Sequence, residues 1–74
     1  MVLDLIVKIT DDGVQAEVPS LKGCESWAHT EEEAILKTID LARFYLNLKN
    51  EQKIDVDLSR KNEEKKVYKL YFDT

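Results

Sequence analysis

The stretch VPSLKGCESWAHTEEEA, residues 18–34, contains the only proline, cysteine, tryptophan and histidine of a 74-residue chain. Pro19 has no N–H to donate to a neighbouring strand, so it is expected to end one. The glycine that follows favours a bend, and CESWAH has the length of a short strand. Thr30 and Glu33 match a capping box with Thr30 as N-cap, and the acids of TEEE suit the positive end of the helix dipole. The stretch therefore predicts a strand end, a bend, a strand over 24–29 and a helix start, with no catalytic role.

Two alternating segments precede this stretch. Residues 2–10 and 14–18 place apolar side chains at every second position, as half-buried strands do. The sequence DDG between them favours a hairpin in which the glycine takes a positive φ. A two-residue loop at 12–13 makes the apolar faces coincide and sets Lys8 opposite Glu17, a favourable cross-strand pair.

The helix is expected to run from Thr30 to about Asn47 or Asn50. Its core stripe consists of Ile35, Ile39, Ala42 and Leu46. Beyond this stripe lie three further apolar side chains, Leu41, Phe44 and Leu48. Either the C-terminal segment covers them or a second chain does, and the sequence leaves both open.

Trp27 is expected on the strand face opposite Cys24 and Ala28. It either packs beneath the C-terminal strands, which we favour, or belongs to an interface, where tryptophan is common. The surface that we hypothesise for binding a partner or a second copy consists of Trp27, Leu41, Phe44 and Leu48.

The remainder of the chain alternates over 53–58 and 67–72, with the charged segment SRKNEEKK between them. We expect a strand, an exposed loop and a last strand, with their pairing undetermined. The sequence thus predicts a single α+β domain over residues 1–74, of order β-β-β-α-β(-β), with one helix packed on an antiparallel three-stranded meander.

Composition narrows the classes of function. Charged residues make up 35% of the chain, apolar residues 43%, and the net charge is −4. An acidic domain is poorly suited to contact phosphates, so direct binding of nucleic acid is not expected. The negative charge either favours a basic partner or serves only solubility. No apolar run approaches the length of a membrane span, and cysteines that could pair are absent, so we expect a cytoplasmic protein. A chain this short gains core by self-association, which predicts a dimer or a higher homo-oligomer.

Candidate chemistry is sparse. Cys24 and His29 would lie on opposite faces of one strand, so they cannot act as nucleophile and base. Asp4 has no acidic neighbour across the hairpin, and Glu17 faces Lys8 in the expected register. We therefore assign no catalytic, cofactor-binding or metal-binding residue, and expect no enzyme.

The order of these features resembles the HicB-like antitoxin family over residues 1–48. The matching residues are Gly13, Ala16, Val18-Pro19, Leu21, Gly23-Cys24, Thr30 and Glu33-Ala34. The resemblance implies a partial ribonuclease H-like fold without the catalytic carboxylates, and a domain that neutralises a small basic ribonuclease toxin of the HicA type by covering it. It covers no DNA-binding domain of the kind that many members carry.

The expected function is therefore non-catalytic protein binding. The alternatives are a metal-dependent nuclease of the ribonuclease H-like type, and a structural homo-oligomer without a toxin partner.

Overall fold

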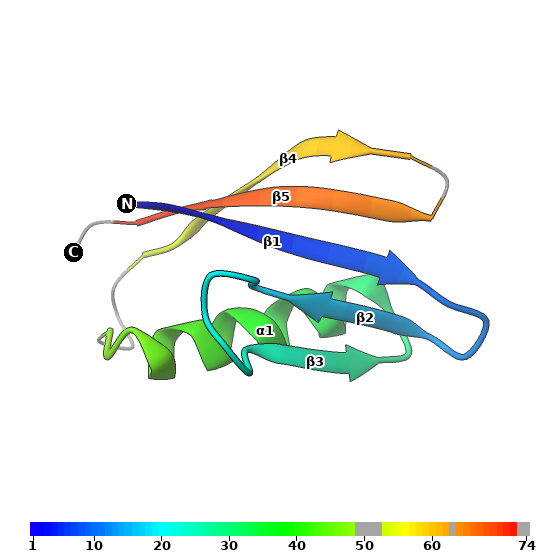
Figure 1. Cartoon of the computed structure of the whole chain (residues 1–74), viewed down its shortest axis with the longest axis horizontal. Coiled ribbons are helices and arrows are strands. Elements are labelled where there is room, and N and C mark those ends of the chain that lie inside the picture. Colours follow the sequence, from blue (N-terminus) through cyan, green and yellow to red (C-terminus); the bar gives the residue numbers. More distant parts are fainter. Residues whose placement is uncertain (49–52, 63, 73–74) are drawn as a thin grey trace.

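A computed structural model describes residues 1–48, 53–62 and 64–72. The elements are β1 (Val2–Ile9), β2 (Val14–Glu17), β3 (Glu25–Ala28), α1 (Glu31–Tyr45), β4 (Asp55–Lys61) and β5 (Lys65–Tyr71). The strands form one five-stranded sheet of order β3-β2-β1-β5-β4, in which every neighbouring pair is antiparallel. Helix α1 lies against one face of this sheet (Figure 1). The α+β class, the N-terminal meander and the single packed helix are confirmed, and the last two strands extend the same sheet beyond β1.

The hairpin between β1 and β2 has an even-length loop, as expected, but in a different place. Thr10 and Gly13 exchange two backbone hydrogen bonds of 2.8 and 3.4 Å, so the loop residues are Asp11 and Asp12. Lys8 consequently lies opposite Gln15, and the predicted pair with Glu17 is wrong. The shift moves each partner by two positions, which keeps the apolar side chains on one face.

Gly13 does not have a positive φ, contrary to the expectation. It belongs to the end of the loop, and a Cβ there would lie 2.6 Å from the Ala28 carbonyl oxygen and closer still to the Trp27 ring. The glycine is required by the close approach of β3 and its tryptophan, since any larger residue would collide with them.

The quoted stretch 18–34 folds largely as its residues predict. β2 ends before Pro19, Gly23 has a φ of +86°, and β3 covers the middle of the predicted strand. The Thr30 side chain accepts a hydrogen bond of 3.2 Å from the Glu33 backbone N–H, so Thr30 is the N-cap of α1.

The helix ends earlier than expected, at Tyr45. Asn47 has a left-handed φ of 56°, and its N–H donates to the Phe44 carbonyl at 3.2 Å. The Leu48 N–H donates to the Arg43 carbonyl at 2.9 Å, which completes a Schellman motif. The predicted end at Asn47 is therefore the capping residue itself, and Asn50 lies outside the described residues.

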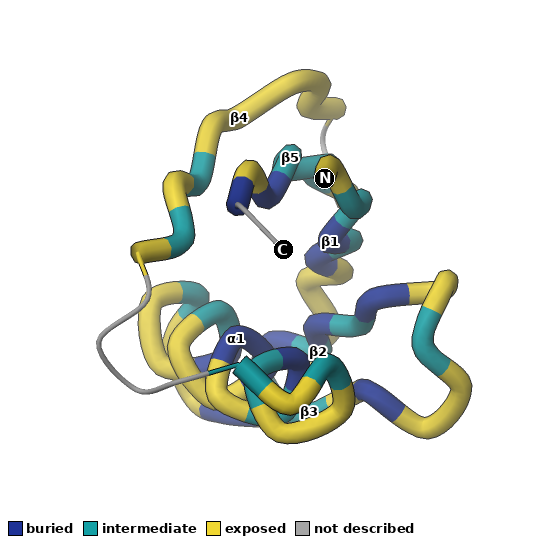
Figure 2. Tube along the Cα trace, turned by 90° about the vertical axis from the view of Figure 1, so that its left-hand side faces the viewer, coloured by how far each residue is buried: buried dark blue, intermediate teal, exposed yellow. Residues whose placement is uncertain are grey.

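The core lies between α1 and the face of the sheet that α1 covers, here called the inner face. Its fully buried members are supplied mainly by the central strands: Leu5 and Val7 of β1, Ala16 of β2 and Leu70 of β5. Figure 2 shows the sheet curling around this core, with buried residues along β1 and β5 and an almost wholly exposed β4.

The C-terminal hairpin is longer than expected. β4 continues to Lys61 and β5 begins at Lys65, so most of the predicted loop belongs to these two strands. Asn62 closes the hairpin because its Oδ1 accepts hydrogen bonds from the Glu64 and Lys65 N–H groups at 3.0 and 2.8 Å. Residue 63 of the predicted loop lies outside the described residues.

Candidate interaction site

Of the four residues hypothesised as one interface, Phe44 and Leu48 line one hollow of about 430 Å³ at the end of α1, whereas Trp27 lies on another element. Phe44, on α1, is 81% exposed, whereas Leu41 is half-buried against the core. Leu48 is half-buried and follows the Schellman motif, so it is not part of a helical apolar arc. Trp27 belongs to β3, on the sheet face turned away from α1, because its neighbour Ser26 points toward the helix.

Trp27 is 43% exposed, so the favoured prediction that it packs beneath the C-terminal strands is wrong. β3 is the edge strand at the opposite side of the sheet from β4 and β5. The Trp27 ring instead approaches Gly13 and contacts the His29 ring edge-on, with 4.9 Å between the ring centroids. These two residues cover the hairpin end of the outer sheet face and do not adjoin Phe44.

A cleft of about 340 Å³ lies between α1 and the C-terminal hairpin. We call it the α1 cleft; its lining residues are Glu31, Glu32, Ile35, Leu36, Ile39, Val56 and Tyr68. Most of its lining is apolar, and Leu36 at its rim is 55% exposed. The cleft exists because α1 packs over β1, β2 and β3, so two inner-face side chains of the C-terminal hairpin, Val56 and Tyr68, are only half-buried, although Leu70 of β5 is fully buried.

Sequence analysis missed this cleft. The apolar pattern placed Ile35 and Ile39 in the core stripe, and Leu36 was not included in it. Leu36 follows Ile35 directly and lies three residues before Ile39. This position indicates that the apolar stripe of the helix extends to one side. What that side faces depends on where β4 and β5 join the sheet.

A charged contact closes the N-terminal end of the cleft. The Glu31 carboxylate accepts hydrogen bonds from the Lys66 Nζ at 2.8 Å and from the Tyr68 hydroxyl at 2.6 Å. These donors hold the pKa of Glu31 below its ordinary value. Burial, together with the hydrogen bond to the carboxylate, raises the pKa of Tyr68 to about 12. At neutral pH the contact therefore consists of an ionised Glu31 and a protonated Tyr68.

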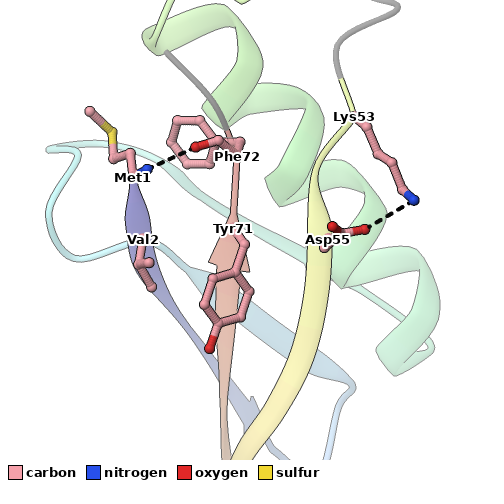
Figure 3. A pocket seen from close by; sticks show the side chains of 6 residues that line it. All are labelled: Met1, Val2, Lys53, Asp55, Tyr71 and Phe72. Atoms are coloured by element: carbon pink, nitrogen blue, oxygen red, sulfur yellow. Dashed lines mark hydrogen bonds and ion pairs between the residues drawn. The ribbon is translucent and has the colours of Figure 1, made fainter.

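A second hollow of about 340 Å³ lies where β1, β4 and β5 come together near both chain ends (Figure 3). The Met1 amino group donates to the Phe72 carbonyl at 2.8 Å, and Lys53 forms an ion pair with Asp55 at 3.4 Å. Tyr71 and Val2 are cross-strand neighbours there. The charged groups of this hollow, which are the Met1 amino group, Lys53 and Asp55, already have hydrogen-bond or ion-pair partners. This hollow therefore offers fewer contacts to a ligand than the α1 cleft.

The residues considered for catalysis are separated. Cys24 is buried under α1, its thiol lies 3.7 Å from the Thr38 carbonyl oxygen, and burial raises its pKa. His29 lies against Trp27 instead. Asp4 forms an ion pair with Lys69 at 2.5 Å. Within residues 1–48, 53–62 and 64–72, no three His, Cys, Asp or Glu side chains are grouped so that they could hold a metal ion.

No helix in the described part of the chain is both long and apolar enough to cross a lipid bilayer. Comparison of the chain with protein-family models, with curated proteins and with solved structures found no match.

Proposed function

We propose that this chain is a non-catalytic protein-interaction domain of the HicB-like kind, which binds a small basic protein of the HicA toxin type through the α1 cleft. The observation that carries the proposal is the cleft itself, an apolar hollow with an exposed leucine at its rim and glutamates at one end. Apolar contact area surrounded by polar residues is the usual composition of a protein-binding surface.

The charge of the chain supports a basic partner. The net charge is −4, and the first turn of α1 carries Glu31, Glu32 and Glu33 beside the cleft. The Glu31 carboxylate accepts hydrogen bonds from Lys66 and Tyr68, whereas the Glu32 and Glu33 side chains are exposed. Opposite charges around an apolar centre increase the association rate and select the partner.

The sequence motif supports the family. Its residues Pro19, Gly23 and Thr30 end β2, make the bend and start α1. In this proposal the fold is a variant of the partial ribonuclease H-like arrangement, with a β4–β5 hairpin after the helix. The nuclease alternative has less support, because Asp4 and Glu31 are each held by a lysine.

Binding to a small basic toxin of the HicA type tests the proposal. The tagged chain and the toxin are co-expressed, purified together and measured by calorimetry. Leu36→Glu is expected to weaken binding by at least about tenfold, because replacing an apolar contact in the interface by an unpaired charge costs about 1.4 kcal/mol or more. The matched control is Val2→Glu, which adds the same charge to a 50% exposed side chain on the outer sheet face.

A wild-type chain that does not retain the toxin contradicts the antitoxin function. Equal binding by Leu36→Glu and Val2→Glu contradicts the assignment of the cleft as the binding site.

A further inference from the structure

Strand β4 is a free edge of the sheet. It pairs with β5 on one side, and no strand among residues 1–48, 53–62 and 64–72 pairs with its other side. Six of its seven residues are exposed, including Leu58 at 48%. A strand edge presents backbone N–H and C=O groups that another strand can pair with. The side chains of β4 therefore determine which strands can pair with this edge.

The charges of β4 are ordered along the strand. Asp55 and Asp57 occupy its first half, and Arg60 and Lys61 its second half. An antiparallel copy of the same strand would run its basic half along the acidic half of the first. A parallel copy in register would instead oppose like charges, which is unfavourable.

A β-bulge decides which of these charges share a face. The pairing of β4 with β5 shifts between Leu58 and Arg60, so Ser59 is the additional residue. Asp57 lies opposite Lys69, and Arg60 lies opposite Val67, two positions along β5. Asp57 and Arg60 therefore both lie on the outer face, whereas strict alternation would separate them.

The faces and charges select one register for two antiparallel β4 strands. Residues directly opposite each other in an antiparallel pair lie on the same face. Asp57 can lie opposite Arg60 of a second copy because both residues lie on the outer face. The two-fold axis that relates the copies also places Arg60 of the first copy opposite Asp57 of the second. The axis then passes between Leu58 and Ser59, so the exposed Leu58 side chains of both copies adjoin on the inner face.

The other edge of the sheet lacks these properties. β3 has four residues, and its one charged side chain is Glu25. A second β3 would bring no opposite charge to Glu25. Self-pairing is therefore favoured at β4 alone of the two edges.

We propose that two copies of this chain associate through antiparallel pairing of their β4 strands, with Asp57 of each copy opposite Arg60 of the other. The two five-stranded sheets join into one continuous sheet. The inner faces of both β4 strands become one surface, so the two α1 clefts lie on the same side of the dimer. This association is independent of whether the cleft binds a toxin.

Charge exchange tests the proposal by sedimentation equilibrium. The wild-type chain is expected to dimerise reversibly at high micromolar concentration. Asp57→Arg and Arg60→Asp each oppose like charges at both symmetry-related contacts, so each alone is expected to weaken dimerisation by about tenfold or more. Mixed together, the two variants restore opposite charges at both contacts and are expected to form a heterodimer. The double variant Asp57→Arg/Arg60→Asp is expected to dimerise as the wild type does.

Three further measurements check the folding of the variants and the place of the contact. Far-UV circular dichroism and urea unfolding identify any variant that fails to fold. Amide hydrogen exchange of the wild-type chain is expected to slow at β4 as concentration rises. The control Phe44→Ser alters the most exposed apolar side chain of α1 and is expected to leave dimerisation unchanged.

A wild-type chain that is monomeric at all these concentrations overturns the proposal. So does a folded pair of single variants that forms no heterodimer. Dissociation by Phe44→Ser with no effect of the β4 variants would assign the interface to α1 instead.

Discussion

Replacing Tyr68 with phenylalanine isolates the contact that joins the start of α1 to the C-terminal hairpin. The substitution removes the hydroxyl that donates to Glu31 at 2.6 Å and keeps the ring that lines the α1 cleft. Glu31 retains its second donor, Lys66, at 2.8 Å. Any loss of stability can therefore be assigned to one hydrogen bond to a carboxylate.

The expected loss follows from the strength and the exposure of that bond. A hydrogen bond to a charged group contributes about 1.5–3 kcal/mol when it is well buried. The Glu31 side chain is 28% exposed, so water and Lys66 compensate in part, and we expect the free energy of unfolding to fall by about 1 kcal/mol. For a domain of this size, that corresponds to a Tm lower by about 4–8 °C.

The pH dependence of the loss gives an independent check. The folded-state pKa of Glu31 is lowered, so its contribution is present above its ordinary pKa and is lost as the pH falls through the lowered value. The pKa of Tyr68 is raised to about 12, so its contribution is present below its ordinary value of 10.0 and is lost as the pH rises through about 12. The difference between wild type and Tyr68→Phe should be constant near neutral pH and shrink toward both extremes.

Urea unfolding followed by circular dichroism at several pH values measures this difference. The matched control is Tyr71→Phe, which removes a hydroxyl on the outer face of the same strand and should change stability by less than about 0.5 kcal/mol. Equal losses from both substitutions, or a loss from Tyr68→Phe that persists unchanged in acid, would refute the reasoning.

Two further substitutions and one labelling reaction test the packing. Gly13→Ala should lower the free energy of unfolding by about 1–3 kcal/mol because the new methyl group collides with Trp27, and an unchanged urea midpoint would contradict this. Thr38→Val keeps the shape of a fully buried side chain but removes the hydroxyl that lies 2.7 Å from the Ser26 Oγ, so urea unfolding should show a loss of about 1 kcal/mol, and a gain would contradict it. The buried thiol of Cys24 should react with a thiol reagent only as fast as the protein unfolds, so rapid labelling of the folded chain would show that the thiol is accessible.

Features of the fold could be predicted from the sequence where the contacts that cause them lie within a few residues along the chain. The Thr30 side chain caps α1 because its bond partner is only three residues away. The apolar faces of β1 and β2 coincide because alternation and an even loop require it. The end of α1 was predicted in part, because Asn47, one of its two expected ends, is the left-handed capping residue shortly after the last helical residue, Tyr45.

Less of the candidate site could be predicted from the sequence. Phe44 was placed in the hypothesised interface and is 81% exposed, but Leu36 was missed, and Trp27 of β3 was grouped with residues of α1, on the other side of the sheet. Helical periodicity gives the direction of a side chain from the helix axis, and it does not give the width of the sheet that the helix covers. The cleft depends on that width.

The sequence by itself determined the elements whose stabilising contacts lie within a few residues: the alternating strands, the bend at Gly23 and the capped start of α1. Tertiary structure alone decided that β5 inserts between β1 and β4, because that order depends on pairing between residues such as Leu3 and Leu70, far apart in the chain. The same long-range packing gave Gly13 its role, since the reason for that glycine is a tryptophan on another strand. It also left β4 at the edge of the sheet with Asp57 and Arg60 on one face, which is the arrangement that carries the proposed dimer.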